Sequence, residues 1–157
     1  MNRLVLPTIQ PQGFSFVEHL SQLIKTISAL DLTTLEKAAD ELYRAWSDRK
    51  KLILLGNGGS ASTASHLAAD FQKCVGEELG TGLRSLCLSD NTPTLTAWAN
   101  DLSYDEAFVQ QTMEWVDPGD VVIAISGSGN SPNVVKAALL SKDRGVYTLG
   151  MTGFDGG

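Results

Sequence analysis

The sequence is poor in features that would assign it to several classes of protein. It has two cysteines among 157 residues, without metal-binding or disulfide spacing, which favours free thiols in a reducing compartment. No apolar run approaches the roughly 18 residues of a membrane helix, and the first residues lack the apolar stretch of a signal peptide. We therefore expect a cytoplasmic protein with no membrane partner.

Positive charge is also scarce in this chain. Lys and Arg number 12 against 18 Asp and Glu, so the formal net charge is −6. Surfaces that bind nucleic acid are normally basic, and we expect no nucleic-acid partner. An anionic small molecule is compatible with this balance, because backbone N–H groups at a turn bind anions without a basic side chain.

Two helices are expected to precede an alternation of strands and helices. Residues 1–13, with two prolines, are expected to form an extended arm. Apolar side chains at helical spacing predict a first helix from Phe14 and a second after Thr33, which forms a capping box with Glu36. The segments 76–82 and 100–104 are expected to be loops. Strands are predicted at 52–55, 83–88, 121–125 and 146–150, and helices at 60–74, 92–99, 105–114 and 131–142.

This alternation predicts an α/β fold with a parallel, doubly wound sheet of the flavodoxin or Rossmann type, flanked by helices. We treat residues 1–157 as one domain, with the N-terminal helices at 14–48 and the α/β core at 49–157. No helix follows the last predicted strand, so we expect a further strand and helix beyond Gly157. Ligands of such sheets bind at the carboxyl ends of the strands.

The first candidate binding loop is Gly56-Asn-Gly-Gly-Ser60, between an apolar strand and a helix. A glycine turn at such a junction presents backbone N–H groups and a helix N-terminus to an anion. With Ala61, the run also fits the relaxed dinucleotide-binding fingerprint. Asp90, the candidate ribose-binding carboxylate, comes about ten residues later than that fingerprint requires. We therefore expect no nucleotide cofactor.

The second candidate loop is Ser126-Gly-Ser-Gly-Asn-Ser131, which follows the third predicted strand. Three hydroxyls and unshielded N–H groups in front of a helix suit a phosphate monoester. Taken singly, each serine also fits a turn, or an N-cap in the case of Ser131. Three serines in six residues at a strand's carboxyl end favour the phosphate site. The lysine of the ATP-binding P-loop is absent.

Two further polar pairs are candidates for the site. His66 and Asp70 lie four residues apart on one face of a predicted helix. That spacing suits a divalent metal or a substrate hydroxyl, whereas the spacing taken alone favours a surface ion pair or a histidine with a structural partner. Asn100 and Asp101 follow an apolar helical stretch, where they fit either sugar hydroxyls or a helix C-terminal turn.

In this order and spacing, the two loops resemble those of the sugar isomerase (SIS) domain, and more closely those of phosphoheptose isomerases. The matching segments are 56–60, 65–70, 95–101, 125–136 and 149–157. The resemblance implies a five-stranded parallel sheet and a tetramer with active sites between subunits. It also implies aldose–ketose interconversion of sedoheptulose 7-phosphate and D-glycero-D-manno-heptose 7-phosphate in heptose biosynthesis.

The same resemblance implies roles for single residues. The implied contacts with the sugar phosphate are Asn57, Gly58, Gly59, Ser60, Asn100 and Asp101, with a phosphate cradle of Ser126, Gly127, Ser128 and Ser131. His66 would be a zinc ligand, and Asp70 both a zinc ligand and a catalytic acid–base group, which makes zinc a candidate cofactor. Asp70 stands where the family has a glutamate, one methylene longer. The family's remaining catalytic glutamine and histidine would lie beyond Gly157.

Two other functions fit the same residues. A relative without activity would bind the replication initiator as a tetrameric scaffold, and the acidic balance of the chain suits a protein partner. A sensor would bind a phosphosugar at the two loops without converting it.

Overall fold

The computed structural model describes residue 13 and residues 15–157, so the predicted N-terminal arm lies almost entirely outside the described residues. The chain divides into two compact units, one reaching to Leu35 and the other running from Glu36 to Gly157. The elements in chain order are α1 (Phe16–Ser28), α2 (Leu32–Ser47), β1 (Lys51–Gly56), α3 (Gly59–Leu79), β2 (Arg84–Cys87), α4 (Thr92–Asp101), the 3-10 helix η1 (Tyr104–Glu106), α5 (Ala107–Trp115), β3 (Val121–Ser126), α6 (Pro132–Asp143) and β4 (Tyr147–Thr152).

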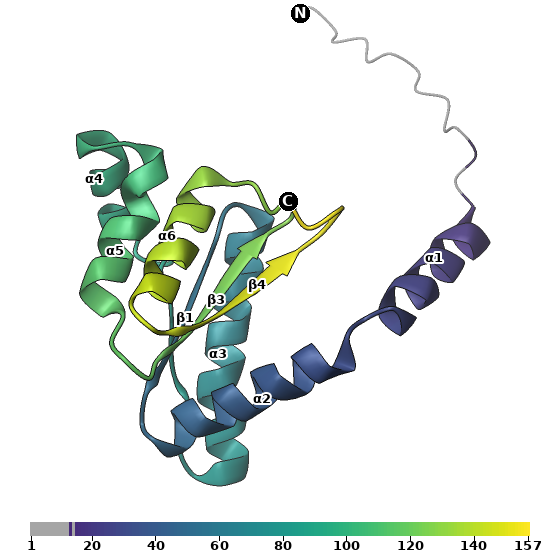
Figure 1. The fold of residues 1–157 in the computed structure, drawn as a ribbon, viewed down its shortest axis with the longest axis horizontal. Helices are drawn as coiled ribbons and strands as arrows, with labels where there is room; N and C mark the ends of the chain where they lie inside the picture. The colour runs from purple at the N-terminus through teal and green to yellow at the C-terminus, as the bar shows by residue number, and fades with distance from the viewer. Residues whose placement is uncertain (1–12, 14) are drawn as a thin grey trace, which may run out of the picture. The chain divides into compact units, whose positions relative to one another are not determined.

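Four parallel strands form the sheet of the second unit, in the order β2-β1-β3-β4 (Figure 1). Leu54 of β1 lies opposite Cys87 of β2 on one side and Ile123 of β3 on the other. The chain winds from β1 outward to β2, then returns past β1 to β3 and β4. The predicted parallel, doubly wound sheet is therefore confirmed. Its order reverses between β1 and β3, where the carboxyl ends of the strands leave room for a ligand.

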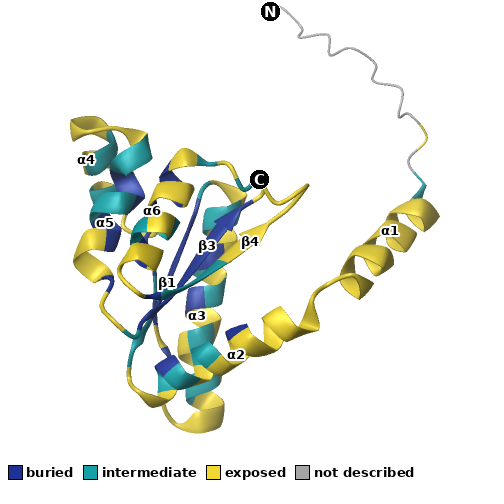
Figure 2. Ribbon diagram, viewed as in Figure 1, coloured by how far each residue is buried: buried dark blue, intermediate teal, exposed yellow. Residues whose placement is uncertain are grey.

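Helices cover both faces of the sheet, which explains why β1 and β3 are continuously apolar. Leu52 and Leu54 pack with buried residues of α2 and α3 on one face, whereas Ile53 and Leu55 pack with residues of α5 and α6 on the other. Figure 2 shows that β1 and β3 hold the buried centre of this unit. Both candidate loops therefore follow strands whose carboxyl ends are buried.

The start of α2 differs from the prediction. The capping box at Thr33 is wrong, because α2 begins at Leu32 and Asp31 precedes it as the cap. The Asp31 carboxylate accepts hydrogen bonds from the Thr34 hydroxyl (2.6 Å) and the Thr33 N–H (3.0 Å). These bonds, first that from Thr34, lower the pKa of the Asp31 carboxyl. Aspartate is a stronger cap than threonine.

Two helices are longer than predicted. Helix α3 continues through Gly76 to Leu79 and ends at Gly80, which has a φ of 79°. Gly76 serves close packing instead of breaking the helix, because a Cβ there would lie 3.2 Å from the backbone nitrogen of Gly82. Helix α4 reaches Asp101, so Asn100 and Asp101 belong to its last turn and not to the predicted loop.

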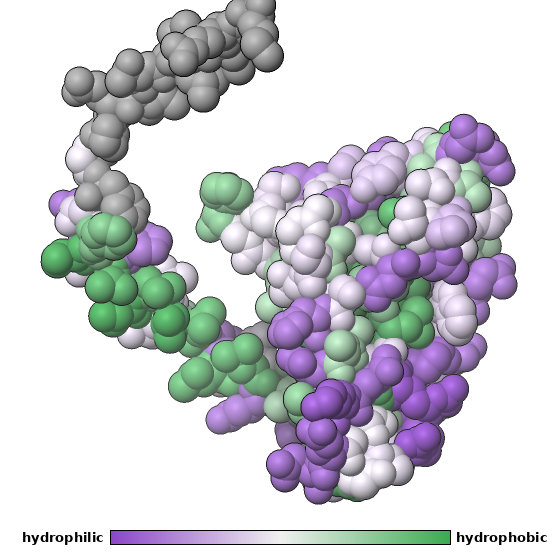
Figure 3. All heavy atoms as spheres, turned by 180° about the vertical axis from the view of Figure 1, so that it is seen from behind, coloured by the Kyte–Doolittle hydropathy of each residue, from purple (hydrophilic) through white to green (hydrophobic). Residues whose placement is uncertain are grey.

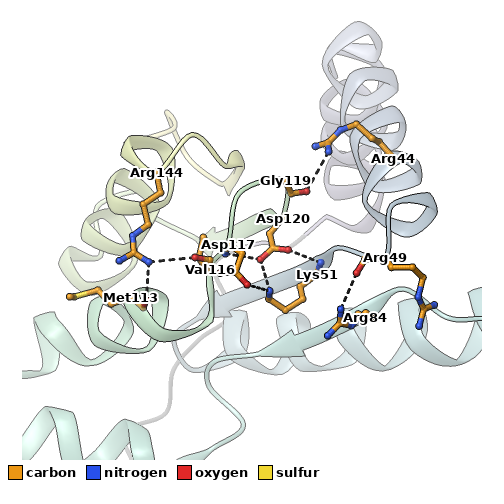
Figure 4. A network of polar contacts seen from close by, with 10 residues as sticks. All are labelled: Arg44, Arg49, Lys51, Arg84, Met113, Val116, Asp117, Gly119, Asp120 and Arg144. Atoms are coloured by element: carbon orange, nitrogen blue, oxygen red, sulfur yellow. Dashed lines mark hydrogen bonds and ion pairs between the residues drawn. The ribbon is translucent and has the colours of Figure 1, made fainter.

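A polar network ties the amino ends of β1 and β3 together, at the opposite edge from the two loops (Figure 4). Fully buried Asp120 accepts hydrogen bonds from the N–H groups of Lys51 and Asp117, both 2.8 Å long. The Lys51 ammonium lies 2.9 Å from Asp120 and 2.7 Å from Asp117.

The described residues include no helix that is long and apolar enough to cross a membrane.

Candidate functional site

The glycine loop turns sharply from β1 into α3. A Cβ on Gly56 would lie 2.9 Å from the backbone of Ser60 in the first turn of α3, so a side chain there would push the helix away from the strand. Gly58, the N-cap, has φ 52° and ψ −120°, a conformation that residues with a Cβ rarely adopt. Among the described residues, no acceptor meets the N–H of Gly58 or of Gly59. The loop thus presents free donors at a helix N-terminus, as an anion site requires.

The side chain of Asn57 is held by two residues from distant segments. Asn57 and Asn133 exchange two amide–amide hydrogen bonds, each 2.9 Å long, and the Tyr104 hydroxyl donates to Asn57 Oδ1 at 2.8 Å. Asn133 lies in the first turn of α6 and is 1% exposed, whereas Tyr104 lies on η1. These bonds join the glycine loop to the start of α6 and to η1.

The serine loop brings two of its three hydroxyls together. Ser126 Oγ, at the end of β3, lies 3.1 Å from Ser131 Oγ. Ser131 precedes α6 as its N-cap, yet its side chain makes no capping hydrogen bond, so the N-cap interpretation does not account for its hydroxyl. The Ser128 hydroxyl instead accepts the Asn130 N–H at 3.2 Å, as in an ordinary turn. Gly127 is exposed beside them.

His66 and Asp70 lie together on the exposed side of α3. His66 Nε2 is 3.4 Å from Asp70 Oδ2, and the side chains are 78% and 51% exposed. A pocket of about 530 Å³ beside His66 is also lined by Ser89 and Asp90, which follow β2. No hydrogen bond or ion pair between described residues joins the His66–Asp70 pair to the serine loop.

The His66–Asp70 pair does not by itself form a zinc site. Zinc sites in proteins take three or four protein ligands. Within the described ranges, 13 and 15–157, no group of three or more His, Cys, Asp or Glu side chains could hold a metal ion. The pair supplies at most two donors, so no chemical step is assigned to a metal.

Asn100 and Asp101 form a pair of their own at the end of α4. Asn100 Nδ2 donates to Asp101 Oδ1 at 2.9 Å, and both residues are exposed. Helix α4 packs against η1, which carries Tyr104. Asn57 thus joins the glycine loop to the start of α6, directly after the serine loop, whereas no hydrogen bond or ion pair between described residues joins the two remaining pairs to that network.

An ion-paired lysine fastens η1 to α6 beside this site. The Lys136 ammonium lies 2.8 Å from the carboxylate of Glu106 and 3.6 Å from that of Asp105. The hydrogen bond to Glu106 is the main cause that raises the pKa of Lys136. This ion pair joins η1, which carries Tyr104, to α6.

Sequence reasoning missed Asn133 and Tyr104 as members of the site. Asn133 follows the N-cap and proline of α6, and its need for a hydrogen-bond partner becomes clear only from its 1% exposure in the structure. Tyr104 carried no local signal, since it lies on the short 3-10 helix η1.

Fold and site together define a parallel α/β domain in which a glycine loop and a serine loop follow the neighbouring strands β1 and β3 at one edge of the sheet. The family model described as "SIS domain" matches residues 15–153. A probable phosphoheptose isomerase from Thermoplasma volcanium is 41% identical over 133 residues, which are 85% of this chain and 67% of that protein. A phosphoheptose isomerase from Shewanella denitrificans is 40% identical over 143 residues, 91% and 72% of the two chains.

The structural comparison agrees with the sequence comparison. Phosphoheptose isomerase GmhA from Neisseria gonorrhoeae superposes with a TM-score of 0.79 at 34% identity, covering 90% of this chain and 74% of that one. The chain therefore belongs to the SIS domain family, in the branch of the phosphoheptose isomerases. It spans between 62% and 72% of the length of the first three curated relatives that it matches.

Proposed function

We propose that the protein is an aldose–ketose isomerase that converts sedoheptulose 7-phosphate into D-glycero-D-manno-heptose 7-phosphate, in heptose biosynthesis. Family membership supports the reaction class. The observation that carries the proposal is the pair of hydroxyls of Ser126 and Ser131, 3.1 Å apart in front of α6. Hydroxyls and a helix N-terminus form a site for a terminal phosphate.

Phosphate binding at the serine loop would leave the sugar chain to run toward the glycine loop. Binding energy at the remote phosphate then orients the reacting carbons. Isomerisation proceeds through a cis-enediol: a base removes the proton from one carbon and returns it to the neighbouring carbon, while a second group moves the hydroxyl proton. We assign Asp70 to the carbon-bound proton. Asn57 and the free N–H groups of Gly58 and Gly59 would donate to sugar oxygens.

Zinc binding by His66 and Asp70 remains a prediction, because these two residues supply only part of a ligand set. Metal analysis of purified protein, with His66→Ala as the comparison, would test it.

A cytoplasmic location is also proposed. Cys74 and Cys87 are both free, and reducing compartments keep thiols in that state.

We propose that the protein assembles with further copies of itself, as a tetramer, through the apolar stripe of α1. None of the residues of α1 is buried, and Figure 3 shows apolar side chains gathered along this helix. The stripe includes Leu20, Leu23, Ile24 and Ile27, each 48–65% exposed. Contiguous exposed apolar surface of this kind marks an interaction site. Light scattering after size exclusion should give four chains, and Ile24→Glu should give a smaller species.

Turnover measured by NMR tests the proposed reaction. Full-length protein is incubated with sedoheptulose 7-phosphate, with and without zinc, and formation of the aldose is followed. Conversion should be lost in Asp70→Ala. An inert wild type that still binds the sugar phosphate by calorimetry, with binding weakened by Ser128→Ala, would identify a sensor. An inert wild type that captures the replication initiator would identify the regulatory scaffold.

A further inference from the structure

We infer that Tyr104 and Asn133 orient the side chain of Asn57 so that it offers a hydrogen-bond donor, and no acceptor, to the ligand. Both are positioning residues that act through Asn57. The inference rests on the proposed function for the identity of the ligand, a sugar phosphate whose oxygens would accept that hydrogen bond. The arrangement of the three side chains rests on their contacts alone.

The hydrogen-bonding capacity of the Asn57 amide shows what remains for a ligand. A side-chain amide oxygen accepts two hydrogen bonds, and the NH₂ group donates two. Asn57 Oδ1 already accepts from Asn133 Nδ2 at 2.9 Å and from the Tyr104 hydroxyl at 2.8 Å. Asn57 Nδ2 donates once, to Asn133 Oδ1. One N–H therefore remains, on a half-buried side chain at the ligand-binding edge.

A backbone group fixes which atom of each amide is the oxygen. The N–H of Val134 points at Asn133 Oδ1, 3.0 Å away. An N–H can only donate, so the atom that it meets must be the oxygen. Asn133 Nδ2 then faces Asn57 Oδ1, and Asn57 cannot rotate its amide by 180° without placing oxygen against oxygen. Because Asn133 is 1% exposed, water cannot satisfy the mismatch.

Tyr104 adds the second restraint from the outer side. Its segment η1 is fastened to α6 by Lys136, whose ammonium meets Glu106 at 2.8 Å. The hydroxyl therefore approaches Asn57 from a segment that is itself joined to α6. An Asn57 amide with its oxygen outward would set lone pairs against the lone pairs of a sugar or phosphate oxygen. The contacts with Tyr104 and Asn133 therefore hold the Asn57 amide in the orientation that can bind the ligand.

Side-chain amide exchange measured by NMR tests the orientation without any turnover. In full-length protein labelled with ¹⁵N at asparagine, the amide protons shared by Asn57 and Asn133 should exchange slowly with water. Addition of sedoheptulose 7-phosphate should shift the remaining Asn57 proton. Tyr104→Phe should speed exchange at Asn57 and lower kcat/KM about 3- to 10-fold, the usual effect of one hydrogen bond. Tyr43→Phe is the control, because it removes a hydroxyl from an exposed side chain of α2. This variant should change neither the exchange at Asn57 nor kcat/KM.

A double-mutant cycle separates positioning from a general structural role. In an Asn57→Ala background, Tyr104→Phe should cause no further loss of kcat/KM, because its partner is gone. Additive losses, or rapid exchange at both asparagines in the wild type, would overturn the inference. A third outcome separates the two claims. If the amide protons exchange slowly in the wild type and faster in Tyr104→Phe, but the wild type shows no turnover, the orientation of Asn57 is supported and the proposed isomerase activity is refuted.

Discussion

Asp120→Asn tests the account of how the sheet is held at the edge opposite the site. One carboxylate oxygen of Asp120 accepts the Lys51 N–H, and the other accepts the Asp117 N–H and the Lys51 ammonium (Figure 4). Asparagine keeps the shape but replaces one oxygen with an NH₂ group. Whichever way this amide turns, its NH₂ meets a backbone N–H donor, and the charge that attracts Lys51 is lost.

The magnitude follows from burial. Asp120 is 0% exposed, so the N–H left without an acceptor costs about 1–3 kcal/mol. Loss of one of the two carboxylates that pair with the Lys51 ammonium, whose side chain is only 15% exposed, adds to this. We expect a total of roughly 2–4 kcal/mol, below the full cost of breaking a buried ion pair. For a chain of this size the melting temperature should fall by about 5–15 °C.

Urea unfolding followed by circular dichroism, at one fixed protein concentration, measures this free energy. Asp117→Asn is the matched control, because that carboxylate contacts the same lysine but its side chain is 71% exposed. The control should lose much less stability than Asp120→Asn. Isomerase activity should survive in both variants. Equal losses in the two variants, or an unchanged Asp120→Asn protein, would refute the reasoning from burial.

Three further predictions concern the site and its support. Gly56→Ala should lower the free energy of unfolding by about 1–3 kcal/mol in urea, because its Cβ would lie 2.9 Å from the backbone of α3; Gly59→Ala, with no atom within 4 Å of its Cβ, should not. The hydrogen bond and charge of Lys51 lower the pKa of Asp117. The contribution of the Asp117 carboxylate to the free energy of unfolding is therefore complete above the ordinary aspartate pKa of about 3.9. It is lost as the pH falls through the lowered pKa of the folded state. The stability difference between wild type and Asp117→Asn should be constant above about pH 5 and vanish in stronger acid. Ser131→Ala should raise KM about 5- to 20-fold with a smaller change in kcat, because a hydroxyl that binds charged phosphate contributes about 1–2 kcal/mol; an unchanged KM would remove the serine loop from the phosphate site.

Much of the fold could be predicted because its signals are local. The apolar run from Leu52 to Leu55 predicts a strand covered on both faces, and the alternation with helices predicts a parallel sheet. The predicted bounds of α3 are wrong because glycine occurs both in loops and at places where two segments pack closely. Gly76 looked like a loop residue, whereas it allows the chain at Gly82 to pass close to a continuous helix.

The candidate site was predictable only in part. The serine and glycine loops could be placed at one edge, because both follow parallel strands. The partners of Asn57 could not be predicted, since Asn133 is 76 residues away and Tyr104 is 47 residues away. Their contacts depend on the order of the strands, which brings the end of β1 beside the start of α6. Side-chain pairing of this kind leaves no periodic pattern in a sequence.

Incorporation of solvent deuterium during turnover tests the central claim most directly. The full-length protein is incubated with sedoheptulose 7-phosphate in D₂O, and the sugar phosphates are followed by proton and deuterium NMR. The account predicts aldose 7-phosphate with deuterium on the carbon next to the aldehyde, where the base returns an exchanged proton. It also predicts a rate lowered about 100-fold or more in Asp70→Asn. Absence of both aldose and deuterium, with the sugar phosphate still bound, would contradict the claim.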